Sequence, residues 1–172
     1  MSLKRIMVIR HGEKPSVDGT VLGVTLEGIS NSDELSVRGW QRAGAFVRFF
    51  APADGQERAG IGRPESLFAQ RQTEHVTSVR APHTLGPLAD FIGKPISTQF
   101  AKGEEELLAA ALSAETATVL VAWEHTRRSS GPTIASTSSG YSRATVRGGV
   151  SIRFLNCCCP AIDRTPSSCV FV

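Results

Sequence analysis

The sequence predicts an α/β domain with a mostly parallel sheet. Two apolar runs, at residues 5–9 and 118–123, have the nearly continuous hydrophobicity of strands that are buried on both faces. Between them, segments with helical spacing alternate with shorter strand-like segments, which is the pattern of βαβ crossovers. A length of 172 residues and an apolar fraction of 41% suit one domain with a buried core.

The remaining elements follow from local signals along the chain. Ser36 is a good N-cap, and apolar residues then recur every three or four positions until Pro52 ends the helix. Gly93 ends a second helical pattern. Residues 13–34 are rich in Gly, Ser, Asp and Pro and predict a loop. The sequence thus predicts strands at 5–9, 66–69, 95–100 and 118–123, and helices at 36–50, 84–92 and 104–112.

The composition changes near residue 127. Residues 1–126 carry 13 Lys and Arg against 15 Asp and Glu, whereas residues 127–172 carry six Arg, a single acid and all four cysteines. The later segment shows no sustained period, apart from a weak strand pattern at 149–155. We therefore divide the chain into a domain at 1–126 and an atypical C-terminal segment at 127–172. Two interpretations of that segment stay open: a disordered tail, and the product of a shifted reading frame.

Charged and titratable side chains fall where the predicted strands end. Arg10 and His11 follow the first strand, Arg80 lies between the second strand and its helix, and Glu124 and His125 follow the last strand. The carboxyl ends of parallel strands form one ligand-binding edge. Arginine presents a fork of donors that matches phosphate oxygens, and a neutral imidazole is a competent nucleophile toward phosphorus. The pattern therefore indicates a site for phosphate chemistry.

These residues resemble the histidine phosphatase superfamily, also called the phosphoglycerate mutase-like family. Four segments carry the resemblance in the right order, within residues 5–126. They are the Arg-His-Gly signature at 10–12, the Leu-Ser-x-x-Gly helix start at 35–39, the Ser-x-Arg-Ala-x-x-Thr segment at 78–84, and the strand at 119–125 that delivers a second histidine. The resemblance implies a three-layer αβα sandwich around a mostly parallel sheet.

The resemblance also implies hydrolysis of phosphomonoesters in two steps, without a metal or another cofactor. His11 attacks phosphorus and becomes phosphohistidine, while Arg10, Arg80 and His125 hold the phosphoryl group. Water then releases phosphate. A mutase is less favoured, because nothing in this short chain resembles the insertion that holds a bisphosphoglycerate-type substrate.

A carboxyl group must protonate the leaving oxygen. In many members of the family this acid is a Glu between the arginine segment and the second histidine, which favours Glu105 and leaves Glu104 and Glu106 as alternatives. Other members place an Asp directly after the second histidine, where this chain has Thr126.

The C-terminal segment departs from the family, in which a helix begins just after the second histidine. Two other hypotheses follow from this departure. The chain could be a catalytically inactive module that binds phosphate or a phosphopeptide, or it could lack elements that a stable fold needs.

Several partners are not expected. The adjacent Cys157, Cys158 and Cys159 have no spacing suited to a metal site, and the arginines at 127–172 are scattered without aromatic residues that would indicate nucleic-acid binding. No apolar run approaches the length of a membrane span, and no signal-peptide pattern is present, so we expect a cytoplasmic protein. The expected partner is a small phosphorylated substrate or phosphate ion, and the oligomeric state stays open.

Overall fold

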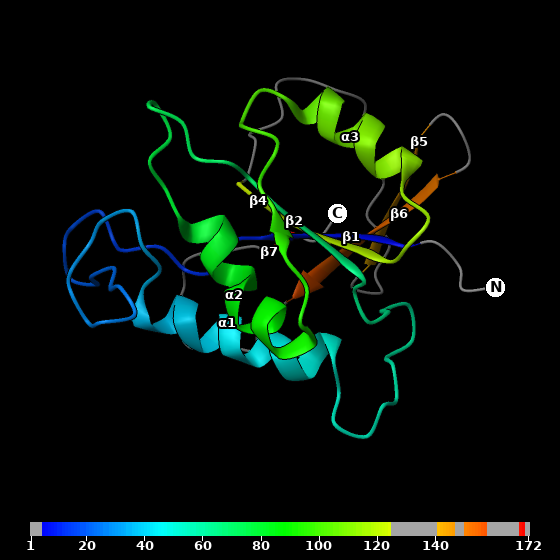
Figure 1. The fold of residues 1–172 in the computed structure, drawn as a ribbon. Coiled ribbons are helices and arrows are strands. Elements are labelled where there is room, and N and C mark those ends of the chain that lie inside the picture. The colour runs from blue at the N-terminus through cyan, green and yellow to red at the C-terminus, as the bar shows by residue number, and fades with distance from the viewer. Residues whose placement is uncertain (1–4, 125–140, 147–149, 158–168, 171–172) are drawn as a thin grey trace.

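The computed structural model describes residues 5–124, 141–146, 150–157 and 169–170, and these form an α/β fold (Figure 1). The strands are β1 (Ile6–Arg10), β2 (Ser66–Ala69), β3 (Ile96–Ser97), β4 (Val119–Trp123), β5 (Tyr141–Val146), β6 (Val150–Cys157) and β7 (Cys169–Val170). The helices are α1 (Val37–Phe50), α2 (Arg80–Ile92) and α3 (Glu105–Ala114). Among the described helices, none combines the length and apolar character needed to cross a membrane.

The sheet has the strand order β3-β2-β4-β1-β6-β5, and β7 pairs with β6. Strands β3, β2, β4 and β1 are all parallel, and β1 is also parallel to β6. Strands β5 and β7 run antiparallel to β6. The prediction of a mostly parallel sheet is therefore confirmed for the described strands, and β6 overlaps the strand expected at 149–155.

Helices cover both faces of the sheet, with α1 and α2 on one side and α3 on the other (Figure 1). One apolar cluster joins Ile9 and Leu120 of the strands to Phe50 of α1 and Leu88 of α2. A second cluster joins the opposite face of the same strands to α3. Strand β4 is buried at every position, which explains its uninterrupted apolar sequence.

The expected helix start at Ser36 is confirmed. The Oγ atom of Ser36 accepts a hydrogen bond from the Gly39 amide at 3.2 Å and donates one to the Glu13 carbonyl at 3.0 Å. The first bond satisfies an amide that the helix start leaves free. The second ties α1 to the segment that follows His11. Both carboxylate oxygens of Glu13 also accept hydrogen bonds from Arg42 Nε at 2.9 Å, so Glu13 fixes this loop to α1.

Two boundaries were predicted wrongly. α2 begins at Arg80 rather than at residue 84, because Pro82 in the first turn needs no amide partner and so does not stop a helix there. β3 spans two residues rather than 95–100, and it pairs with β2 alone within the described sheet. α3 agrees with the prediction within two residues at its end, with Glu104 as its N-cap.

A close contact between Gly12 and Gly39 fixes the start of α1 against the end of β1. A Cβ atom at Gly39 would lie 2.5 Å from the Glu13 carbonyl oxygen, and one at Gly12 would lie 3.0 Å from the Gly39 carbonyl oxygen. The nearest atom at each position belongs to the backbone, which cannot move aside as the end of a side chain can. A Cβ atom at Gly39 would therefore force the backbone to shift, and one at Gly12 would make a tight contact.

We expect Gly39→Ala to lower the free energy of unfolding by about 1–3 kcal/mol, the usual cost of an extra methyl group in a packed site. Chemical denaturation measures this change. Gly44→Ala, in the same helix, is the control: a Cβ there meets no atom within 4 Å, and alanine should stabilise the helix by about 0.5–1 kcal/mol. Equal effects of the two variants would contradict this account of the contact.

Candidate functional site at the carboxyl edge of the sheet

The predicted site residues gather where the parallel strands end. His11 directly follows β1, Gln70 follows β2 and Glu124 follows β4, while α2 brings Arg80 back to the same edge. The loop at 13–34 and the segment between β2 and α2 both leave from this edge (Figure 1). His125, the expected second histidine, lies outside the described residues, as do most positions of the segment at 127–172.

His11 is buried, with 7% of its surface exposed. Its Nδ1 atom lies 2.7 Å from the Gly12 carbonyl oxygen. Because a carbonyl oxygen can only accept, Nδ1 carries the hydrogen and the neutral ring has its lone pair on Nε2. Burial lowers the pKa of His11 from its ordinary 6.5, and the positive charges of Arg80 and Arg10 lower it further. The site therefore favours a neutral imidazole with its lone pair on Nε2.

A chain of hydrogen bonds connects this histidine segment to α2. The Oγ1 atom of Thr84 accepts a bond from the Gly12 amide at 2.7 Å and donates one to the Arg80 carbonyl at 2.6 Å. Thr84 is fully buried. The four-residue spacing from Arg80 to Thr84 is one helical turn, which places both on the side of α2 that faces β1. The threonine thereby joins α2 to the segment that contains His11.

Arg10 and Arg80 each present a donor that has no partner. Their Nε atoms are buried, and no described residue accepts a hydrogen bond from either of them. A buried donor without a partner costs about 1–3 kcal/mol. Burial lowers the pKa of Arg80, although guanidinium groups stay charged at neutral pH. A bound anion with several acceptor oxygens would satisfy both arginines.

Arg80 also holds the loop that precedes α1. Its NH1 atom donates to the Ser32 carbonyl at 3.0 Å, and the Val79 amide donates to the Asp33 carbonyl at 3.2 Å. Buried Glu34 pairs with His83 Nδ1 at 2.7 Å. These contacts fasten the end of the 13–34 loop to the first turns of α2. The Glu34–His83 pair was not predicted, because the two residues lie 49 positions apart and His83 occupies a variable position of its motif.

The predicted acid, Glu105, lies on the α3 side of the sheet. Its Oε1 atom accepts hydrogen bonds from Trp123 Nε1 at 3.3 Å and from the Gly103 amide at 3.1 Å. Burial alone would raise the pKa of Glu105, but these hydrogen bonds outweigh it and lower the pKa. Its neighbour Glu104 accepts from the Ala101 amide at 2.8 Å and from Arg71. Both carboxylates therefore accept hydrogen bonds from backbone amides just before α3.

Another carboxylate influences His11 through its charge. The charge of Glu124 influences the pKa of both His11 and Arg80. Its Oε2 atom pairs with Lys102 Nζ at 3.1 Å, and its amide donates to Gln70 Oε1 at 3.0 Å. The sequence placed Glu124 at the end of a strand but assigned it no role. Gln70 could have been found in the same way, since it directly follows a predicted strand.

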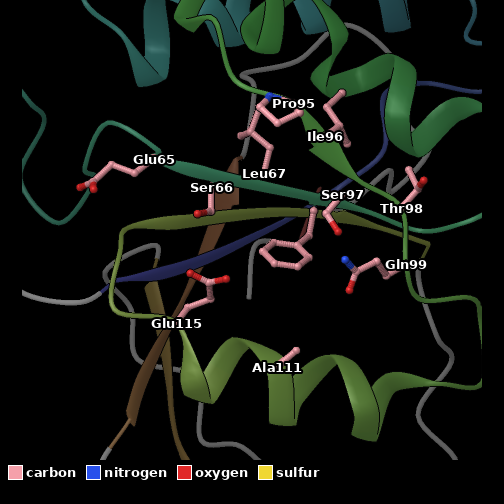
Figure 2. Close-up of a pocket in the computed structure, with 11 residues that line it drawn as sticks. Glu65, Ser66, Leu67, Pro95, Ile96, Ser97, Thr98, Gln99, Ala111 and Glu115 are labelled. Atoms are coloured by element: carbon pink, nitrogen blue, oxygen red, sulfur yellow. The ribbon is translucent and has the colours of Figure 1, made fainter.

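A pocket of about 530 Å³ lies elsewhere, between α3 and the outer strands β2 and β3 (Figure 2). Its walls include Ser66 at the start of β2, Gln99 after β3 and Glu115 just after α3. None of the predicted site residues lines it. The candidate site at the carboxyl edge is thus separate from this pocket.

The chain matches no family model and no curated protein.

Proposed function

We propose that this protein is a metal-independent phosphomonoester hydrolase of the histidine phosphatase type, with the three-layer phosphoglycerate mutase-like architecture. The observation that carries the proposal is the pairing of a buried, neutral His11 with two buried arginine Nε donors that lack partners. The nucleophile and the phosphate-binding groups are all side chains of the protein. Phosphoryl transfer at such a site needs no metal ion to supply either function.

The proposed reaction begins when the two arginines bind the phosphate group of the substrate. Charge-assisted hydrogen bonds from Arg10 and Arg80 would satisfy both Nε donors and neutralise the charge on the phosphoryl oxygens. The lone pair on His11 Nε2 then attacks phosphorus and the bond to the leaving oxygen breaks. The hydrogen bond from Nδ1 to the Gly12 carbonyl holds the ring in the reactive tautomer throughout.

Water completes the reaction by releasing phosphate from phosphohistidine. His125 is proposed as a further phosphate-binding and catalytic residue on the strength of the family resemblance. Glu105 is the acid that the same resemblance favours, although its carboxylate is bound to Trp123 and Gly103. We favour a hydrolase over a mutase, with a small phosphorylated molecule as the substrate.

The experiment that tests this function measures hydrolysis of 4-nitrophenyl phosphate by the full chain in the presence of a metal chelator. We expect release of 4-nitrophenolate that survives the chelator. We also expect a ³²P label that stays on the protein after an alkaline quench and is lost in acid, as phosphohistidine requires. Saturable binding of inorganic phosphate by folded protein without turnover would contradict the enzyme proposal and favour a binding module.

A further inference from the structure

We infer that Glu124 is the general base of the second step, in which water attacks the phosphohistidine. This inference rests on the proposed function, because it assigns a residue to a reaction at the same site. It also separates the two carboxylates: Glu124 directly follows β4, whose neighbour β1 ends just before His11, and Glu105 accepts a hydrogen bond from Trp123 on the α3 side.

The register of the sheet places Glu124 next to His11. β1 and β4 are parallel, and their last pair is Arg10 with Trp123. The His11 amide donates to the Trp123 carbonyl at 3.4 Å, and this hydrogen bond belongs to that last pair. His11 and Glu124 therefore each directly follow the last residue of two neighbouring strands, which lie about 4.8 Å apart.

Two side chains hold Glu124 in place at the edge of the site. Gln70, at the end of β2, accepts a hydrogen bond from the Glu124 amide at 3.0 Å and so fixes its backbone. Lys102 pairs with its carboxylate at 3.1 Å, and 36% of the Glu124 side chain stays exposed. The carboxylate is thus oriented by a cation and open to water, as a base that must accept a proton from water should be.

The charge of this carboxylate suits a base rather than an acid. Burial would raise the pKa of Glu124, but the bond and charge of Lys102 outweigh it and lower the pKa. Glu124 is therefore ionised at neutral pH in the free protein. Lys102 also balances the negative charge, which reduces the repulsion that a lone carboxylate would exert on an incoming phosphate.

The second step is the hydrolysis of phosphohistidine. The oxygen of a water molecule forms a bond to phosphorus while the bond from phosphorus to His11 Nε2 breaks, and its electron pair returns to the ring. One proton of that water moves to the Glu124 carboxylate. Phosphate leaves, and Glu124 then gives its proton to the solvent. In the first step with an aryl phosphate, 4-nitrophenolate leaves without needing a proton.

The test follows both steps with 4-nitrophenyl phosphate in the full chain, comparing wild type with Glu124→Gln. Glutamine keeps the size of the side chain and an oxygen that faces Lys102, but it cannot accept the proton. We expect kcat to fall about 10²-fold or more, the usual contribution of a positioned base. The initial burst of nitrophenolate and kcat/KM should change little, and ³²P-labelled protein should accumulate in the steady state.

Two further variants separate the possible outcomes. Glu74→Gln removes an exposed carboxylate from the segment between β2 and α2 and should behave like wild type. Glu105→Gln tests the rival carboxylate. Accumulation of label in Glu105→Gln instead of Glu124→Gln would overturn the inference, as would equal losses of burst and turnover in Glu124→Gln. If wild type itself forms no alkali-stable label, the proposed function fails before this inference is reached.

Discussion

Replacing His11 by alanine is expected to abolish phosphatase activity, with a loss of about 10⁴-fold or more in kcat. No other described imidazole can replace it, because the reactive position depends on the burial of His11 and on its bond to the Gly12 carbonyl. Both the burst of nitrophenolate and the ³²P label should disappear. Stopped-flow absorbance and an alkaline quench measure these two quantities.

The matched control for this variant is His75→Ala. His75 is exposed in the segment between β2 and α2, so its loss should leave activity within about twofold of wild type, as for most surface positions. A phosphoprotein that persists in His11→Ala would show that another residue is the nucleophile.

The acid limb of the pH profile of kcat/KM should lie below pH 6.5, because the pKa of His11 is lowered from that value and the neutral ring is the reactive form.

Replacing Arg80 by lysine is expected to lower kcat/KM by about 10²–10³-fold, the typical loss when one pre-oriented donor to a transition state is removed. Lysine keeps the positive charge, but it has no counterpart to the buried Nε donor and no planar fork. Arginine can donate to the Ser32 carbonyl and bind an anion at the same time, whereas lysine cannot do both. Steady-state kinetics measure the loss, and calorimetry should show weaker binding of inorganic phosphate.

Arg71→Lys is the matched control. Arg71 directly follows Gln70 and is exposed, and its guanidinium pairs with Glu104 at 3.5 Å on the α3 side. A surface pair of this kind contributes at most about 1 kcal/mol to stability, so the exchange should leave the kinetics nearly unchanged. Equal losses in the two variants would show that a general change in charge or folding, rather than phosphate binding, explains the effect at Arg80.

The fold could be predicted largely from the sequence, because burial leaves a clear pattern. Strand β4 is apolar at every position because both of its faces are covered. Helix α1 begins directly after Ser36, whose side chain caps it. The start of α2 was missed because proline usually marks a boundary, whereas Pro82 lies in the first turn, where it is tolerated. The length of β3 was missed because edge strands have weak patterns.

The candidate site could be predicted where its residues follow strands or belong to a spaced motif. His11, Arg10, Arg80 and Glu124 were all located in this way. The contacts that give these residues their properties could not be predicted, because they join distant segments. Lys102 meets Glu124 across 22 positions, and the Gly12 amide meets Thr84 across 72. Only the folded chain brings these partners together.

The acceptor that sets the tautomer of His11 belongs to the main chain. No substitution at position 12 can remove this acceptor, because every residue has a main-chain carbonyl oxygen. Substitutions can only displace it, and its place depends on the contact between Gly12 and Gly39. Mutations that impair the reactivity of His11 should therefore include mutations of Gly39 in the first turn of α1, and these would reduce activity and stability together.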